Sequence, residues 1–102
     1  MAIGCYNKAV SAYWFAIEAL IKSILLKNRR QIYEKEGKLI SELRRFLLEA
    51  KPKYVELIAE INTIYSWRKI ADHRSGLITE EKAKEIGEKA KYIFHRLLPL
   101  VE

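Results

Sequence analysis

This chain of 102 residues has a single cysteine, Cys5, and only two histidines. One cysteine cannot form an intramolecular disulfide, and neither residue type occurs at the spacing of a zinc site. The four glycines are scattered and form no phosphate-binding fingerprint. The sequence therefore predicts an intracellular, cytoplasmic protein with no disulfide, no metal site and no cofactor.

Acidic residues are fewer than basic ones. The chain has thirteen Asp and Glu and nineteen Lys and Arg, which gives a net charge of +6. Such an excess is consistent with binding to a polyanion, although lysines often only solvate a surface. Half the residues are hydrophobic and 31% are charged, as in ordinary globular domains. A chain of this length predicts one domain, residues 1–102, with a single core.

The longest apolar run, residues 9–26, raises the question of a membrane span. Lys8, Glu18 and Lys22 argue against one, because a charge near the bilayer centre costs at least about 2.5 kcal/mol. No small-residue cleavage site of a signal peptide follows the run. We therefore expect a buried helix in a protein that does not enter a membrane.

The segment that contains this run, from Ile3 onward, has the three-and-four spacing of an amphipathic helix that ends near Asn28. Its polar residues form a narrow stripe made of Lys8, Ser11, Glu18 and Lys22. The remaining apolar face is wider than a small bundle needs. We expect this face, including Trp14 and Phe15 beside the stripe, to suit a dimer interface.

Two further helices follow a polar run, residues 28–37, that predicts a connecting loop. The second helix, residues 39–50, must stop at Lys51 because Pro52 disfavours helical geometry in the residue before it. Pro52 suits the first turn of the third helix, whose apolar stripe leads towards Arg68.

A fourth helix follows a break in the pattern at residues 73–76. It begins after Thr79, which we expect to be its N-cap, and it ends before Pro99. Four amphipathic helices without any strand signal predict an all-α fold. The expected architecture is an antiparallel up-and-down four-helix bundle.

The stretch from Arg68 to His73 holds two residues able to act on a phosphate. Arginine offers paired hydrogen bonds to a phosphate, and histidine, which titrates near neutral pH, can serve as general acid or base. On a continuous helix the two would point about 140° apart, so they can share a substrate only if the helix ends between them. The alternative is structural: Arg68 pairs with Asp72 at i,i+4, and His73 caps the helix end.

Residues 9–22 and the motif from Arg68 to His73 together resemble the HEPN family of small helical bundles. The first segment is Ala-rich and apolar with a Glu-x-x-x-Lys step, and the second matches the family's arginine and histidine separated by four to six residues. The resemblance implies a metal-independent endoribonuclease in which two subunits line one composite cleft. Arg68 would bind the scissile phosphate, and His73 would transfer protons.

Two acidic residues are candidates for a supporting role in that site. Glu18 matches the acidic position of the family's first helix, and Asp72 lies within the motif itself. The alternative for Glu18 is an exposed i,i+4 pair with Lys22.

Basic residues near the motif and at the helix ends are candidates for contacts with an RNA backbone. Tyr65 and Trp67 are candidates for stacking on bases, and the alternative for both is a place in the core. The candidate phosphate contacts are Lys69, Arg74, Arg29, Arg30, Arg44 and Arg45. The alternative for each of them is simple solvation.

Three functions remain open. The first is a homodimeric endoribonuclease, which would suit the toxin of a toxin–antitoxin pair. The second is a HEPN module without catalysis that binds a nucleotide or a minimal nucleotidyltransferase. It is favoured by Lys69, where the family commonly has a small polar residue, and by Ser75, where toxin members carry a tyrosine that the antitoxin modifies with AMP. The third is a dimerising helical scaffold.

Overall fold

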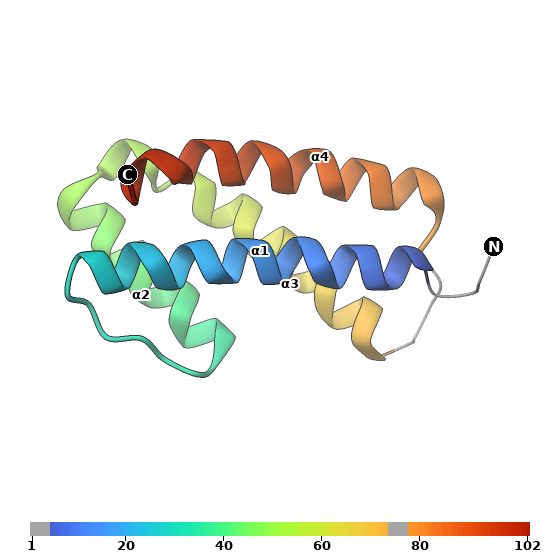
Figure 1. Ribbon diagram of the computed structural model, residues 1–102, viewed down its shortest axis with the longest axis horizontal. Helices are drawn as coiled ribbons and strands as arrows, with labels where there is room; N and C mark the ends of the chain where they lie inside the picture. Colours follow the sequence, from blue (N-terminus) through green and yellow to red (C-terminus); the bar gives the residue numbers. More distant parts are fainter. Residues whose placement is uncertain (1–4, 74–77) are drawn as a thin grey trace.

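The computed structural model describes residues 5–73 and 78–102. Within these ranges the chain is all-helical and has no strand. In chain order the elements are α1 (Cys5–Lys27), α2 (Glu36–Ala50), the short 3-10 turn η1 (Pro52–Tyr54), α3 (Leu57–His73), α4 (Glu80–Leu97) and a second 3-10 turn η2 (Leu98–Leu100). The predicted four-helix bundle is confirmed (Figure 1).

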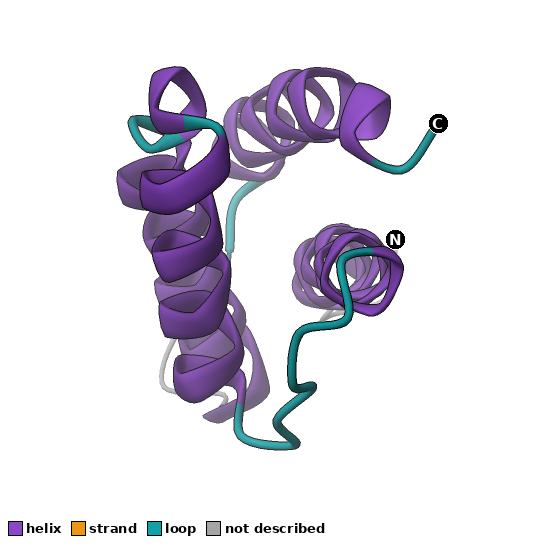
Figure 2. Cartoon of the chain, turned by 90° about the vertical axis from the view of Figure 1, so that its left-hand side faces the viewer, coloured by secondary structure: helices purple, strands orange, loops and turns teal. Residues whose placement is uncertain are grey.

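The helix α1 is the central element of the bundle, since it packs against α2, α3 and α4. α3 runs in the opposite direction to both α1 and α4, and the segment 28–35 carries the chain back along the molecule before α2 begins (Figure 1). Seen from the end, α4 lies above α1, while α2 and α3 cover its side (Figure 2). Three neighbours for one helix explain why α1 is the longest and most apolar of the four.

Most helix boundaries agree with the sequence-based expectations. α1 ends at Lys27, and α2 ends at Ala50, just before Lys51 and Pro52. The prediction that Pro52 opens the third helix is wrong, because Pro52 begins the separate turn η1 and α3 starts only at Leu57. A proline at the first position fits a 3-10 turn as well as an α-helix, since neither needs its missing N–H there.

The expected N-cap of α4 is confirmed. Thr79 has an extended backbone, and its hydroxyl accepts a hydrogen bond of 3.1 Å from the backbone N–H of Lys82. α2 begins at Glu36, three residues before the expected Leu39, so Glu36 and Gly37 belong to a helix rather than to the predicted loop.

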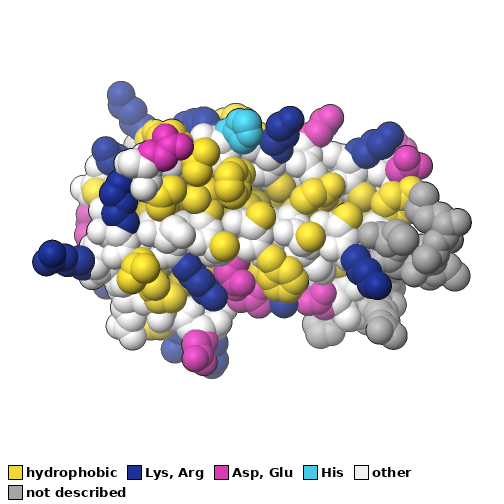
Figure 3. Space-filling view, viewed as in Figure 1, with side chains coloured by type: hydrophobic (Ala, Val, Ile, Leu, Met, Phe, Trp, Pro, Cys, Tyr) yellow, Lys and Arg dark blue, Asp and Glu magenta, His cyan; other side chains and the backbone are white. Residues whose placement is uncertain are grey.

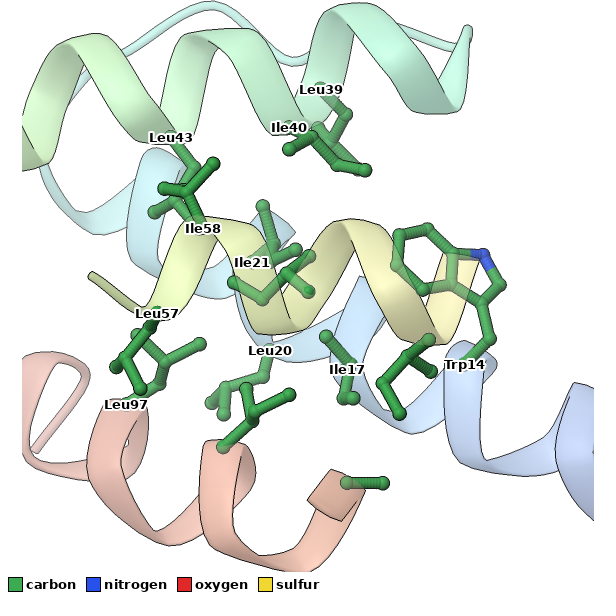
Figure 4. Packing of buried hydrophobic residues seen from close by; sticks show 14 of the residues in the cluster. Trp14, Ile17, Leu20, Ile21, Leu39, Ile40, Leu43, Leu57, Ile58 and Leu97 are labelled. Atoms are coloured by element: carbon green, nitrogen blue, oxygen red, sulfur yellow. The ribbon is translucent and has the colours of Figure 1, made fainter. Parts of the chain in front are cut away.

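The core is formed by apolar side chains from all four helices (Figure 4). Trp14 of α1 is fully buried and packs its ring against Tyr65 of α3, with 5.0 Å between ring centres. The largest fully buried side chains are Trp14, Ile17, Ile21, Ile24, Leu25, Leu39, Leu43, Leu47, Leu57, Ile61, Ile64 and Ile93. Each such side chain contributes about 1.5–3 kcal/mol through burial.

The orientation of α1 differs from the expected one. Ser11, Glu18 and Lys22 of the predicted polar stripe are half-buried, whereas Phe15 is 49% exposed. Trp14, expected beside Phe15 on a dimer face, lies in the core instead. The stripe turns inward because Asp72 of α3 and Glu36 of α2 supply polar partners for Ser11 and Glu18.

α1 also has the length and apolar composition of a membrane span, and it is the one such helix in the described part of the chain. Core helices of soluble proteins pass the same test. In the qualifying segment, Tyr6–Lys27, only 39% of the most apolar window is buried inside the protein. A large share of this apolar helix is therefore left uncovered by its own chain.

Candidate functional site

Arg68 lies on the inner side of α3, where α1 and the start of α2 meet it. Its Nη1 donates a hydrogen bond of 2.8 Å to Oε1 of Glu36, the first residue of α2. Its Nε lies 2.9 Å from Oδ2 of Asp72, one turn later on α3. This Nε is buried, and its N–H is not aligned on any acceptor, so the contact with Asp72 is an ion pair rather than a hydrogen bond.

Three side chains of α1 complete the surroundings of Arg68. The Phe15 ring lies under the guanidinium carbon at 5.5 Å from the ring centre, a cation–π distance. Trp14 Nε1 donates a hydrogen bond to Oε2 of Glu36, and Ser11 Oγ donates one of 2.9 Å to Oδ1 of Asp72. We refer to Ser11, Trp14, Phe15, Glu36, Arg68 and Asp72 as the Arg68 cluster.

Glu18 adjoins this cluster and is electrostatically coupled to it. Burial raises the pKa of the Glu18 carboxyl, and the charge of Glu36 and a hydrogen bond to it raise the pKa further. The charges of Lys22 and Arg68 act in the opposite direction without cancelling the shift. The structure therefore brings together three predicted site residues, Arg68, Asp72 and Glu18.

Positions 68 and 73 lie on one continuous helix. α3 runs from Leu57 to His73, as expected from the break in the pattern that begins at His73. The condition for the two residues of one chain to share a substrate, a helix end between them, is not met. By helix geometry the two positions project about 140° apart. The side chain of His73 and all of Arg74 lie outside the described part of the chain.

The last turn of α3 stays helical because α1 holds it. Asn7 Nδ2 donates a hydrogen bond of 3.3 Å to the carbonyl oxygen of Ala71, whose own side chain is buried. Asn7 Oδ1 accepts one of 3.0 Å from the backbone N–H of Ile78. Asn7 of α1 thus contacts the last turn of α3 through Ala71 and the start of the next described segment through Ile78.

The remaining basic candidates are not in the Arg68 cluster. Lys69 is exposed, and its Nζ lies 4.5 Å from the centre of the Tyr65 ring. Arg30 packs over Phe46 and pairs with Glu42 and Glu49 of α2. Arg29, Arg44 and Arg45 are exposed, and Arg45 Nη1 lies 3.3 Å from the buried Glu42.

The two aromatic candidates pack against the core. Tyr65 and Trp67 are half-buried, Tyr65 against Trp14 and Trp67 beneath the ammonium of Lys82 at 5.2 Å. Each of these rings is therefore already in contact with a side chain of its own chain, Tyr65 with Trp14 and Trp67 with Lys82. These contacts agree with the core alternative for both residues.

Sequence reasoning missed Glu36, Ser11, Trp14 and Phe15 as neighbours of Arg68. A weak signal existed for Glu36 alone, since an acidic residue in the first turn of a helix is favoured by the helix dipole. Among the described residues no group of three or more His, Cys, Asp or Glu is arranged to hold a metal ion. No family model, curated protein or solved structure matches this chain.

Proposed function

We propose that this chain is a metal-independent endoribonuclease of the HEPN type that acts as a homodimer, as the toxin of a toxin–antitoxin pair would. The observation that carries the proposal is the fixed orientation of Arg68. Glu36 and Phe15 hold its guanidinium in place, while 22% of the Arg68 side chain remains exposed. A preorganised, partly exposed arginine suits a phosphodiester ligand.

A second subunit is part of the proposal because α3 is continuous. Positions 68 and 73 lie about 140° apart around α3, so we do not expect one chain to place both residues on one phosphate. Two chains related by a two-fold axis offer two arginines and two histidines to a shared cleft.

In the reaction we propose, one His73 takes the proton from a ribose 2′-hydroxyl. The 2′-oxygen then forms a bond to phosphorus as the bond from phosphorus to the 5′-oxygen breaks. Water donates a proton to that leaving oxygen and is restored by the proton held on His73, while Arg68 of the other subunit stabilises the extra negative charge on the phosphoryl oxygens. The products carry a 2′,3′-cyclic phosphate and a 5′-hydroxyl.

The test is incubation of the purified protein with structured RNA in EDTA, followed by analysis of the product ends. The wild type is expected to give 2′,3′-cyclic phosphates, and His73→Ala and Arg68→Ala are expected to give none. Arg96→Ala is the matched control, because Arg96 also contacts a carboxylate, Glu56 at 3.5 Å, and the rings of Tyr54 and Tyr92. Equal cleavage by the wild type and His73→Ala would contradict the proposal.

The second candidate is a HEPN module without catalysis that binds a nucleotide or a minimal nucleotidyltransferase. One specific observation favours it: Glu36 and Asp72 already balance the charge of Arg68 within the chain. In that case the protein would co-purify with a nucleotidyltransferase encoded beside it and would leave RNA intact. Arg68→Ala would then weaken the fold without affecting any RNA substrate.

A further inference from the structure

The uncovered face of α1 has the spacing of a coiled-coil seam. Its exposed residues are separated by four, three, four and three positions, as in the heptad pattern of paired helices. They are Ala12, Ala16, Ala19, Ser23 and Leu26. The Ser23 hydroxyl donates to the carbonyl oxygen of Ala19 in the same helix, so the seam offers no unsatisfied side-chain donor.

We propose that a second copy of this chain covers this seam, with α1 packed antiparallel against α1 of the other copy around a two-fold axis at Ala19. This inference rests on the homodimer proposed above, but it does not depend on RNA cleavage. Alanines on both helices allow the backbones to approach closely. Hydrophobic side chains gather on this face, over α1 and its border with α4 (Figure 3).

Leu26, the one large side chain of the seam, and the neighbouring Phe15 both face small residues when the seam meets a copy of itself. A two-fold axis at Ala19 places each residue opposite the one equally far on the other side of position 19. Leu26, which is 69% exposed, then meets Ala12 of the second copy, and Phe15 meets Ser23. Each large side chain faces a small one, as packing without voids or overlap requires.

A groove beside the seam provides room for the larger side chain. It lies between α1 and α4, has a volume of about 360 Å³, and Tyr13, Ala16, Ala90 and Phe94 are among its lining residues. Leu26 of the second copy arrives about one helical turn from Ala16, at the edge of this groove. The same face thus carries both a protruding apolar side chain and a hollow for its counterpart.

The charges at the border of the seam are also complementary to a second copy. Lys22, half-buried at the edge of this face, falls beside Phe15 of the other chain, whose ring attracts an ammonium. The five residues of the seam itself carry no charge, so pairing places no charge between the two helices along the seam. Because Phe15 also packs under Arg68 within its own chain, this interface reaches the Arg68 cluster.

The first experiment measures the mass in solution of the wild type and of Ala19→Glu. The wild type is expected at twice the 12.0 kDa of one chain. Two glutamates facing each other on the axis should raise the dissociation constant of the dimer by about a hundredfold or more, without loss of helix, because Ala and Glu are both good helix formers. Leu48→Glu is the control, since Leu48 is exposed on α2 and should leave the dimer intact.

The second experiment tests the position of the axis by disulfide formation. In a Cys5→Ser background, Ala19→Cys should form a cross-linked dimer on mild oxidation, because only residues close to a two-fold axis meet their own copies. Ser41→Cys, on the exposed side of α2, should not.

The outcomes separate this interface from the proposed activity. A wild type that stays monomeric at high concentration would overturn the interface. Binding of that monomer to vesicles of phosphatidylcholine and phosphatidylserine would assign the seam to a membrane surface instead. A dimer that Ala19→Glu leaves intact would also overturn the interface, even if the protein cleaves RNA. A dimer that depends on Ala19 but cleaves no RNA would support the interface and contradict the proposed function.

Discussion

Arg68 of α3 donates a hydrogen bond of 2.8 Å to Glu36, the residue that begins α2. The other oxygen of the same carboxylate accepts from Trp14 of α1, so Glu36 connects three helices. Both partners of the ion pair are less than a quarter exposed, which places it between surface pairs and fully buried ones. Arg68 therefore has a structural role whether or not it also binds a phosphate.

Glu36→Gln tests that structural role. The loss of a charged hydrogen-bond partner for a largely buried arginine should lower the free energy of unfolding by about 1.5–3 kcal/mol. Urea denaturation at neutral pH measures the change. Glu85→Gln is the matched control, because its pair with Lys82 is more exposed and contributes at most about 1 kcal/mol. Equal decreases in the free energy of unfolding for the two substitutions would show that the contact of Glu36 with Arg68 stabilises the fold no more than an exposed ion pair does.

The raised pKa of Glu18 predicts a dependence of stability on pH. Because burial and Glu36 raise the pKa in the folded state, the folded protein binds more protons than the unfolded one above the ordinary value of 4.5. Stability should therefore fall as the pH rises from that value through the folded pKa. Glu18→Gln should flatten this fall and be more stable than the wild type at pH 7. Parallel curves for the two proteins between about pH 4 and 7 would refute the coupling.

Two glycines in helices should respond differently to alanine. A Cβ on Gly37 would meet nothing within 4 Å, so Gly37→Ala should stabilise the protein by up to about 1 kcal/mol. A Cβ on Gly87 would come within 2.9 Å of the Tyr13 ring, which must then move. Gly87→Ala should gain less than Gly37→Ala or should destabilise the fold. Chemical denaturation of both variants measures the difference, and a larger gain at Gly87 would contradict the observed packing.

The helices were predictable because their apolar residues recur at helical spacing and their ends carry clear boundary signals, such as Pro52 after α2 or the N-cap Thr79 before α4. The rotation of α1 was not predictable, because nearly its whole circumference is apolar and periodicity cannot say which side faces water. Only the tertiary partners Glu36 and Asp72 decide that its polar stripe turns inward. Glu36 and Asp72 lie far along the sequence from Ser11 and Glu18, so no local pattern in the sequence predicts these contacts.

The end of α3 at His73 was predictable from the break in the pattern at residues 73–76. The long-range contact from Asn7 to Ala71 that holds its last turn was not, because no local pattern links the two residues. The continuity of α3 up to His73 is what makes a second subunit necessary in the proposed activity.

The most direct test of that activity is complementation between inactive subunits. Arg68→Ala and His73→Ala are each expected to leave RNA uncut as homodimers. Mixed dimers of the two, formed by co-expression and checked by mass, contain one intact Arg68 and one intact His73 on different chains. If the cleft is composite, the mixed dimers should restore the formation of 2′,3′-cyclic phosphate ends in EDTA. Mixed dimers that leave RNA uncut, beside a wild type that cleaves it, would contradict a site shared between two chains.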